Sequence, residues 1–230
     1  MKILSIVIPV YNEARTLAEL LRRVKAAKLP EGIEKEIIVV DDASTDGTEE
    51  IIRQTEGIRT VRHTGNRGKG ASVRDGLKQA SGDYVIIQDA DLEYNPEEYA
   101  AVIRPLMGGT ADVVYGSRFL SGEAKKAMFF SQYWSNKILT LFSNLMTGLY
   151  LTDMETCYKA MTREVTRAVA EKVTSERFGI EPEITALVKN YRVKEVPISY
   201  FGRGRREGKK IKAADGMAAI WHIIKFNFKN

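Results

Sequence analysis

The sequence predicts an α/β fold in which helices flank a central, mostly parallel β-sheet. Short apolar runs that suit buried strands alternate with stretches whose apolar residues recur at helical spacing, at intervals of roughly 25–40 residues. This alternation favours parallel strands joined by right-handed helical crossovers. Polar motifs rich in carboxylates follow several of the apolar runs, which places them at the sheet edge where such folds bind ligands.

The expected elements follow one another along the whole chain. Strands are predicted at residues 3–10, 36–40, 58–62, 84–87, 112–115 and 192–200. Helices are predicted at residues 14–27, from 44–46 onward, from the glycine-rich loop 65–70 to residue 80, and at 96–106, 163–173, 181–190 and 213–228. Residues 128–150 mix large apolar with polar side chains, which predicts one or two amphipathic helices, packed on the sheet or lying on a membrane surface.

The composition is that of a globular protein with one large domain. The chain has 230 residues, of which 44% are hydrophobic and 28% are charged. Its one cysteine, Cys157, excludes an intrachain disulfide and favours a reducing, cytoplasmic compartment. We find neither a signal peptide nor a run of roughly 18 apolar residues, and therefore expect a protein that is not integral to a membrane.

Charge is divided unevenly along the chain, whose net charge is +5. Residues 1–120 carry 16 Lys and Arg against 19 Asp and Glu, whereas residues 121–230 carry 19 against 11. An acidic half followed by a basic half suits a polyanionic ligand between them, or an anionic surface under the second half. We do not expect nucleic acid as the partner, since the basic half has no recognisable nucleic-acid motif.

Two carboxylates, Asp89 and Asp91, directly follow the continuous apolar run at residues 84–87, which is typical of a strand buried on both faces. Carboxylates at the carboxyl end of a parallel strand can hold a hard divalent cation whose other ligands are water or phosphate oxygens. An isolated Asp-x-Asp triplet is more often a solvated turn. Its place after a buried strand favours a metal–phosphate site, provided that the chain also forms a nucleotide pocket.

Two other loops are expected at the same edge of the sheet. Asp41 and Asp42 follow the second strand and suit hydrogen bonding to a ribose or a base. Alternatively, Asp42 caps the next helix and Asp41 accepts hydrogen bonds from loop amides. Arg118 follows the strand at residues 112–115 and would face the same cleft.

Several other kinds of site are excluded by their missing motifs. The chain has no Gly-x-x-x-x-Gly-Lys-Ser/Thr motif, no dinucleotide-binding glycine pattern and no Gly-x-Ser-x-Gly elbow. Two histidines and one cysteine, His63, His222 and Cys157, form no zinc-binding pattern, and we expect structural or incidental roles for them.

Five motifs in order resemble those of the family 2 glycosyltransferases. They are Ile8-Pro-Val-Tyr-Asn-Glu13, Val39-Val-Asp-Asp-Ala-Ser-Thr-Asp-Gly47, Asn66-Arg-Gly-Lys-Gly-Ala71, Ser81-Gly-Asp83 and Asp89-Ala-Asp91. The second half resembles the polyprenyl-phosphate sugar synthases of that family, at Gly116-Ser-Arg118, Thr152–Lys159, Phe178–Ile184, Val196–Tyr200 and Glu207–Ile211. The resemblance implies a GT-A (Rossmann-like) domain at residues 1–212 and an amphipathic helix at 213–230, packed on that domain or at the membrane surface.

The resemblance also implies roles for single residues in an inverting transfer from a nucleotide-sugar. The residues that would bind the nucleotide are Pro9, Tyr11, Glu13, Val40, Asp42, Lys69, Asp89, Ala90 and Asp91. Of these, Asp89 and Asp91 would hold the diphosphate through Mg²⁺ or Mn²⁺. Glu93 would lie near the donor sugar, where many relatives have Gln, so recognition of that sugar is expected to differ.

The acceptor implied by the resemblance is a polyprenyl phosphate. An anionic acceptor needs no general base, but it needs cations to position it against the donor. The candidates are Arg118, Arg203, Arg205, Arg206, Lys209 and Lys210, and Arg118 is the one we also expect to act in catalysis with Asp89 and Asp91. If the acceptor is a hydroxyl compound instead, Asp153, Glu181 or Glu183 could position cations or act as base.

The sequence therefore predicts a metal-dependent transferase that moves a hexose from a GDP-mannose or UDP-glucose type of donor to a polyprenyl phosphate at the cytoplasmic membrane face. Residues 129–136 lack the Arg that some prenyl-phosphate enzymes have there, and membrane contact would depend on residues 128–150 and the last helix. A module that binds a nucleotide-sugar or an anionic surface without catalysis is the non-enzyme alternative, against which the presence of both Asp89 and Asp91 argues.

Overall fold

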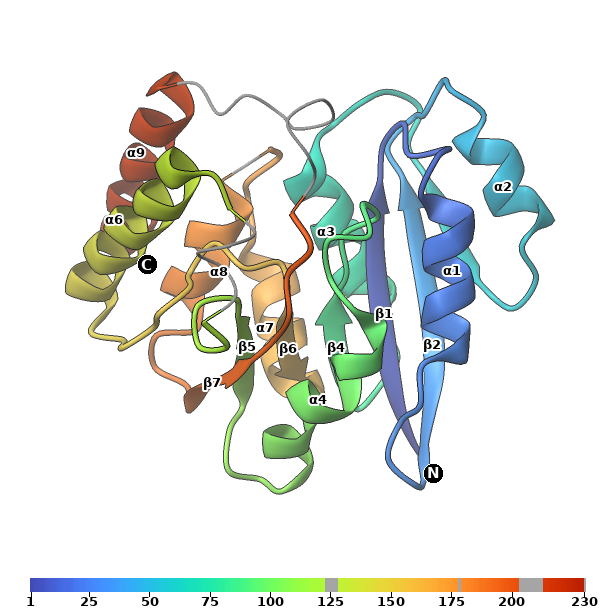
Figure 1. Ribbon diagram of the computed structural model, residues 1–230, viewed down its shortest axis with the longest axis horizontal. Coiled ribbons are helices and arrows are strands. Elements are labelled where there is room, and N and C mark those ends of the chain that lie inside the picture. The colour runs from blue at the N-terminus through green and yellow to red at the C-terminus, as the bar shows by residue number, and fades with distance from the viewer. Residues whose placement is uncertain (123–127, 178, 203–212, 230) are drawn as a thin grey trace.

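The computed structural model describes residues 1–122, 128–177, 179–202 and 213–229 (Figure 1). Its centre is a seven-stranded sheet with the order β3-β2-β1-β4-β6-β5-β7. The strands are β1 (Lys2–Val10), β2 (Ile33–Asp41), β3 (Arg59–Arg62), β4 (Tyr84–Ile87), β5 (Val113–Ser117), β6 (Lys159–Thr162) and β7 (Val193–Pro197). All neighbouring strands pair in parallel except β6, which is antiparallel to both β4 and β5.

Helices cover both faces of the sheet. They are α1 (Leu17–Ala26), α2 (Thr48–Gln54), α3 (Lys69–Gln79), the 3₁₀ helix η1 (Pro96–Glu98), α4 (Tyr99–Met107), α6 (Phe130–Thr147), α7 (Arg163–Lys172), α8 (Ile180–Leu187) and α9 (Ala213–Lys229). Figure 1 shows α3 and α7 on one face, with α1 and α4 on the other. At the β5 side of the molecule, α6, α8 and α9 pack on one another.

The core lies between the sheet and its helices and explains why the apolar runs become strands. All four residues of β4 are buried, as the continuous apolar run at residues 84–87 predicts. On α1, the apolar side chains that face the core are Leu17, Leu20, Leu21 and Val24, and the polar ones face outward. The mostly parallel sheet flanked by helices confirms the predicted fold class.

Two local predictions differ from the structure. The strand β6 was missed, because it has only four residues, includes Lys159 and continues directly into α7. The helix after Asp42 begins at Thr48 rather than at residues 44–46, because Gly47 adopts a left-handed φ of 95° and the Asp46 carboxylate accepts the Thr48 N–H. Residues 128–150 contain one helix, α6, in agreement with the one or two helices predicted there, and it is followed by Gly148 with a left-handed φ of 73°.

None of the helices within the described parts of the chain combines the length and the apolar character needed to cross a bilayer.

Candidate active site

The parallel strands bring three polar loops to one edge of the sheet. The carboxyl ends of β2, β4 and β5 point the same way, because β6 is antiparallel to both of its neighbours. Asp41 and Asp42 lie at the end of β2, Asp89 and Asp91 follow β4, and Arg118 follows β5. The structure therefore places the predicted carboxylates and Arg118 along one edge, as the sequence indicates.

Asp42 holds the glycine-rich loop in place. Its Oδ1 accepts hydrogen bonds from the Arg67 N–H at 2.8 Å, and its Oδ2 accepts one from the Gly68 N–H at 2.7 Å. The same Oδ1 lies 2.7 Å from Nδ1 of His63. The Asp42 carboxylate is thus engaged with amides of the glycine-rich loop and does not cap α2, which was its alternative role.

Asp41 is buried beside it and keeps one oxygen unbonded. Oδ1 accepts the Ser44 N–H at 3.0 Å. Oδ2 has no hydrogen-bond partner within the described residues, although the Arg62 Nε lies 3.6 Å away. Asp41 is thus buried and held by the Ser44 N–H and by the charge of Arg62.

The loops after β1 and β2 are bonded to each other. Asn12 N–H donates to Ser44 Oγ at 2.9 Å, and the Asn12 side-chain oxygen accepts the Thr45 N–H at 2.8 Å. Among the residues predicted to bind nucleotide, Pro9 and Val40 are neighbours across β1 and β2, and Tyr11 is 48% exposed. The Tyr11 ring is therefore open to a ligand.

A lysine joins the Asp89 loop to α8. The Nζ of Lys69 lies 2.9 Å from Asp89 Oδ1 and 2.9 Å from Glu181 Oε1. Burial would lower the pKa of Lys69, but the charges of Asp89 and Glu181 outweigh it and raise that pKa well above its ordinary value. Burial would likewise raise the pKa of Asp89, and Lys69 lowers it instead. Both groups are therefore charged at neutral pH.

The segment after Asp89 turns sharply at Leu92. Leu92 has a left-handed φ of 64°, and the Glu93 N–H donates to Asp91 Oδ1 at 3.2 Å. The Tyr200 hydroxyl donates to Glu93 Oε2 at 2.8 Å, which ties this segment to the chain after β7. Ala90, between the two aspartates, is buried.

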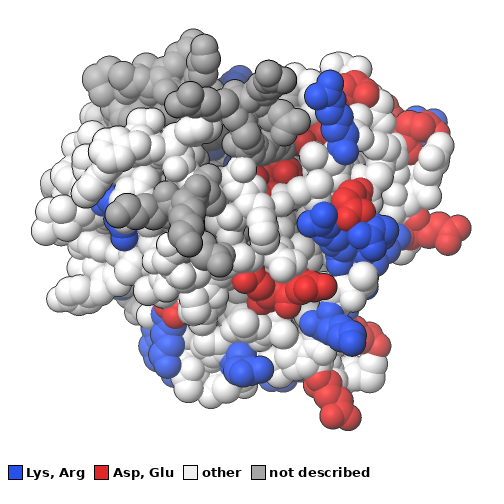
Figure 2. All heavy atoms as spheres, viewed as in Figure 1, with Lys and Arg blue, Asp and Glu red and all other residues white. Residues whose placement is uncertain are grey.

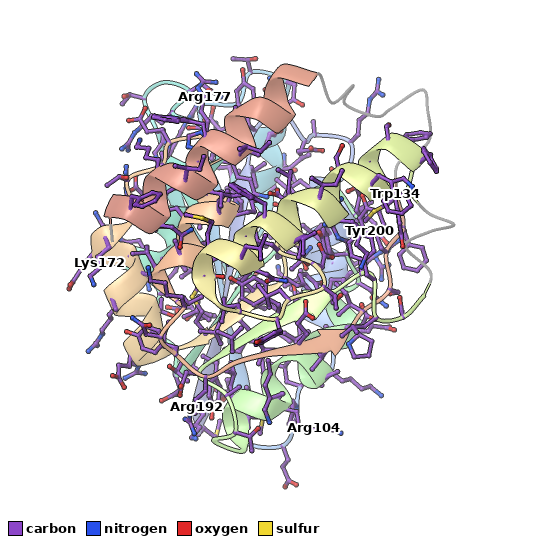
Figure 3. All side chains as sticks on the ribbon, turned by 90° about the vertical axis from the view of Figure 1, so that its left-hand side faces the viewer. Arg104, Trp134, Lys172, Arg177, Arg192 and Tyr200 are labelled. Carbon is purple, nitrogen blue, oxygen red and sulfur yellow. The ribbon has the colours of Figure 1, made fainter. Side chains whose placement is uncertain are left out.

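Arg118 forms a buried ion pair with Asp153. Arg118 Nε and Nη2 each donate to one Asp153 oxygen at 2.7 Å. Burial would lower the pKa of Arg118, and the Asp153 carboxylate raises it well above its ordinary value. The guanidinium also lies over the Tyr200 ring at 5.2 Å, and Figure 3 shows Tyr200 near the Trp134 end of α6.

The other predicted acceptor-binding cations, Arg203, Arg205, Arg206, Lys209 and Lys210, lie outside the described residues. Their role stays a prediction, as does that of Arg118 in phosphate binding. Its guanidinium is oriented by Asp153, while Glu195 accepts the backbone N–H groups of Thr152 and Asp153 and so holds that loop.

The structure reorders the candidate bases for a hydroxyl acceptor. Asp153 is used by Arg118, and Glu183 accepts the N–H groups of Thr174 and Ser175. Glu155, which the sequence did not single out, has a buried Oε1 without a hydrogen-bond partner in the described part of the chain. Burial and the charge of Glu181 raise the pKa of Glu155 to about 7. The available signal was that Glu155 lies within Thr152–Lys159, one of the stretches that resemble the polyprenyl-phosphate sugar synthases.

A central, mostly parallel sheet with carboxylates and cations at the carboxyl ends of its strands has the arrangement in which open α/β proteins bind ligands. The model of the family described as "Glycosyl transferase family 2" matches residues 5–169, and the chain belongs to this family. The fold agrees: the glucosyl-3-phosphoglycerate synthase of Mycobacterium tuberculosis, solved with Mn²⁺, UDP and phosphoglyceric acid, superposes with a TM-score of 0.75. That match has 19% identity and covers 98% of this chain and 78% of the other. The predicted GT-A fold is confirmed.

Curated relatives are also similar over most of this chain. An uncharacterized protein of Methanocaldococcus jannaschii is 32% identical over 84% of this chain and 79% of its own length. The dolichol-phosphate mannosyltransferase of Pyrococcus furiosus is 31% identical over 96% of this chain. The UDP-N-acetylglucosamine–dolichyl-phosphate N-acetylglucosaminyltransferase of Methanococcus voltae is 25% identical over 86% of this chain and 85% of its own length. The match spans 62% of the Pyrococcus enzyme, so that enzyme has a substantial part outside the match.

Proposed function

We propose that this protein transfers a hexose from a nucleotide-sugar to a polyprenyl phosphate, with inversion at the anomeric carbon and with Mg²⁺ or Mn²⁺ at Asp89 and Asp91. The observation that carries the proposal is the carboxylate pair at the end of the fully buried β4, beside the Lys69 ammonium. Membership of family 2 supports the nucleotide-sugar donor. The names of the Pyrococcus and Methanococcus relatives support the lipid phosphate acceptor.

The donor set suits a magnesium-type ion. Within the described residues, no cluster of three or more His, Cys, Asp or Glu side chains could enclose a metal. Asp89 and Asp91 would supply carboxylate oxygens and leave the other positions to water and diphosphate oxygens, which is how Mg²⁺ is usually held. When bound, the ion stabilises the negative charge that develops on the departing nucleotide diphosphate.

The chain's own residues orient the donor and the acceptor. The nucleoside would lie over the β1 and β2 loops, against the exposed Tyr11 ring. The phosphate acceptor is already an anion, so no proton has to be removed before it attacks the sugar. Arg118, held by Asp153, and the cations of residues 203–210 would position it.

One observation favours a second candidate, transfer to a hydroxyl compound. A hydroxyl acceptor must lose a proton, and a carboxylate whose pKa is near 7 suits that task. The pKa of Glu155 is about 7, and its Oε1 has no hydrogen-bond partner among the described residues. Replacing Glu155 with Gln would abolish transfer to a hydroxyl acceptor and would leave transfer to a phosphate largely intact.

The outer face of α6 supports contact with a lipid surface. Phe130, Trp134, Ile138, Leu141 and Leu145 recur at spacings of three and four residues and are 50–81% exposed. Figure 3 shows α6 side by side with α9. Figure 2 shows Lys, Arg, Asp and Glu of the described residues gathered mainly toward the β1 and β2 side of this face. On α9, Ile220, Trp221 and Phe228 are exposed too. Aromatic and aliphatic side chains in one stripe suit burial at the boundary between headgroups and acyl chains.

Vesicle sedimentation tests this contact. We expect the full chain to sediment with vesicles of phosphatidylcholine and phosphatidylglycerol, and Ile138→Ser combined with Leu141→Ser to lower the bound fraction several-fold. Light scattering on both proteins gives their oligomeric state and so tests the alternative that the exposed apolar face of α6 is the interface of a dimer. A dimer that the double substitution converts to a monomer, without any change in vesicle binding, would contradict the membrane contact.

A partition assay tests the proposed reaction. Purified protein, Mn²⁺ and radiolabelled GDP-mannose, UDP-glucose or UDP-N-acetylglucosamine are incubated with and without a polyprenyl phosphate in detergent. We expect one donor to give label that extracts into butanol and depends on the lipid phosphate. Asp91→Asn should abolish this product, and the matched control Glu97→Gln, an exposed carboxylate nearby, should keep it. Label found only in water-soluble product would refute the lipid acceptor.

A further inference from the structure

His63 joins three elements of the nucleotide-binding half. It follows β3, is 6% exposed, and its backbone N–H donates to the Asp41 carbonyl at the end of β2. Its ring Nδ1 lies 2.7 Å from Asp42 Oδ1, and its Nε2 lies 3.1 Å from Asp75 Oδ2 on α3. One imidazole thus bridges the β2 loop and the helix that follows the glycine-rich loop.

The two carboxylates determine how many N–H donors the His63 ring needs for both contacts to be hydrogen bonds. An ionised carboxylate only accepts hydrogen bonds, whereas a neutral imidazole has one N–H donor and one acceptor nitrogen. Both ring nitrogens of His63 face carboxylate oxygens, so both contacts are hydrogen bonds when the ring is doubly protonated. Loss of one proton turns one contact into repulsion between two acceptors.

The charged groups around His63 come from every element packed against it. Asp42 and Asp75 face the ring, and Arg67 and Arg74 both pair with Asp75, at 2.8 Å and 3.3 Å. The adjacent Arg62 pairs instead with Asp41 and Glu49. Among the described residues, both arginines that reach this cluster pair with Asp75, and His63 is the side chain that hydrogen-bonds Asp42.

Asp42 transmits the position of His63 to the donor site. Its other contacts are the N–H groups of Arg67 and Gly68, directly before α3. Gly68 has a left-handed φ of 94°, and a Cβ there would collide with the Glu176 carbonyl oxygen, so the loop has little room to shift. The next residue, Lys69, pairs with Asp89. The path from His63 to the proposed metal-binding carboxylate is therefore continuous.

We infer that His63 is a positioning residue for the donor, and that its doubly protonated ring holds Asp42, the glycine-rich loop and Lys69 in the arrangement that binds nucleotide. Donor affinity therefore falls when the ring loses a proton. The inference rests on the proposed function for the identity of the ligand. The role of His63 concerns donor binding alone, so the result of the lipid phosphate assay does not affect it.

Donor affinity measured against pH tests the inference. Calorimetric titration with UDP-glucose and with GDP-mannose, in Mn²⁺, is carried out between pH 5.5 and 8.5. For the donor that binds, we expect the wild-type Kd to rise about tenfold over this range, because a ring with one N–H can donate to only one of the two carboxylates. His63→Gln should bind more weakly at pH 6 and show little pH dependence. His222→Gln, which changes the other of the chain's two histidines, should keep the wild-type profile.

A second measurement on the unaltered protein keeps the test independent of the folding of the His63 variant. Two histidines give two imidazole C2–H resonances, which His222→Gln assigns. Since linkage is reciprocal, nucleotide binding should move the His63 titration midpoint upward by about one pH unit if the coupling is tenfold. An unchanged midpoint would overturn the inference, and so would a His63→Gln protein with the wild-type Kd and pH profile. Absence of binding by both nucleotide-sugars would contradict the proposed function as well.

Discussion

The buried pair of Arg118 and Asp153 gives a prediction whose size follows from the structure. Asp153 is fully buried, and its carboxylate accepts three hydrogen bonds from Arg118, two from the guanidinium and one from the backbone N–H. Asp153→Leu would leave the guanidinium buried without its partner. Removing one member of a buried pair costs about 3–5 kcal/mol, mostly from the uncompensated charge.

The double variant separates this charge effect from lost packing. Arg118→Met combined with Asp153→Leu removes both charges, and replacing a whole buried pair by apolar side chains is often close to neutral. We therefore expect the double variant to be destabilised by less than either single variant, a coupling of at least about 3 kcal/mol.

Urea unfolding at pH 7 measures these free energies through the transition midpoint and the slope. The matched control is Arg192→Met, which breaks a pair with Asp112 whose arginine side chain is 62% exposed. An exposed pair contributes at most about 1 kcal/mol, so this variant should shift the midpoint little. Additive effects of Arg118→Met and Asp153→Leu, or losses as small as the control, would refute the account of a buried, mutually dependent pair.

Three other outcomes are expected. Burial raises the pKa of Glu155 from an ordinary 4.5 to about 7 in the folded protein. Glu155 therefore leaves the free energy of unfolding unchanged below pH 4.5, and lowers it as the pH rises from 4.5 to about 7. Glu155→Gln should therefore raise the melting temperature at pH 8, by the equivalent of up to ~3 kcal/mol, and leave it unchanged at pH 4; equal shifts at both pH values would contradict this. Lys69→Met should weaken donor binding at least tenfold, because Asp89 and Glu181 lose their shared cation; calorimetry showing wild-type affinity would contradict it. Gly76→Ala should cost about 1–3 kcal/mol in urea unfolding, since its Cβ would collide with Val7; an unchanged midpoint would contradict it.

The sequence predicts the parallel part of the fold well because its signals are local. The run at residues 84–87 is β4 to the residue, since an unbroken apolar segment of this length suits a strand covered on both faces. The same reasoning places Asp89 and Asp91 directly after it. By contrast, β6 depends on antiparallel pairing with β4 and β5, distant in sequence, and its buried Lys159 breaks the apolar pattern.

Side-chain roles within the site were harder to predict than the site's position. A motif shows that Asp42 lies at the sheet edge, but the direction of its carboxylate depends on the glycine-rich loop 25 residues later in the chain. His63 received no specific role, because its two carboxylate partners come from separate elements. Glu155 was missed for a related reason: the group that repels it, Glu181, is on α8.

The role of Asp89 and Asp91 in holding a metal-bound diphosphate is tested most directly by one calorimetric comparison. Binding of the nucleotide-sugar that the protein uses is measured on the wild-type chain and on Asp91→Asn, each with Mn²⁺ and with EDTA. We predict that Mn²⁺ raises the wild-type affinity at least tenfold and raises that of Asp91→Asn little. Equal affinities for the wild-type protein in Mn²⁺ and in EDTA, with normal binding by Asp91→Asn, would contradict the metal site at this edge of the sheet.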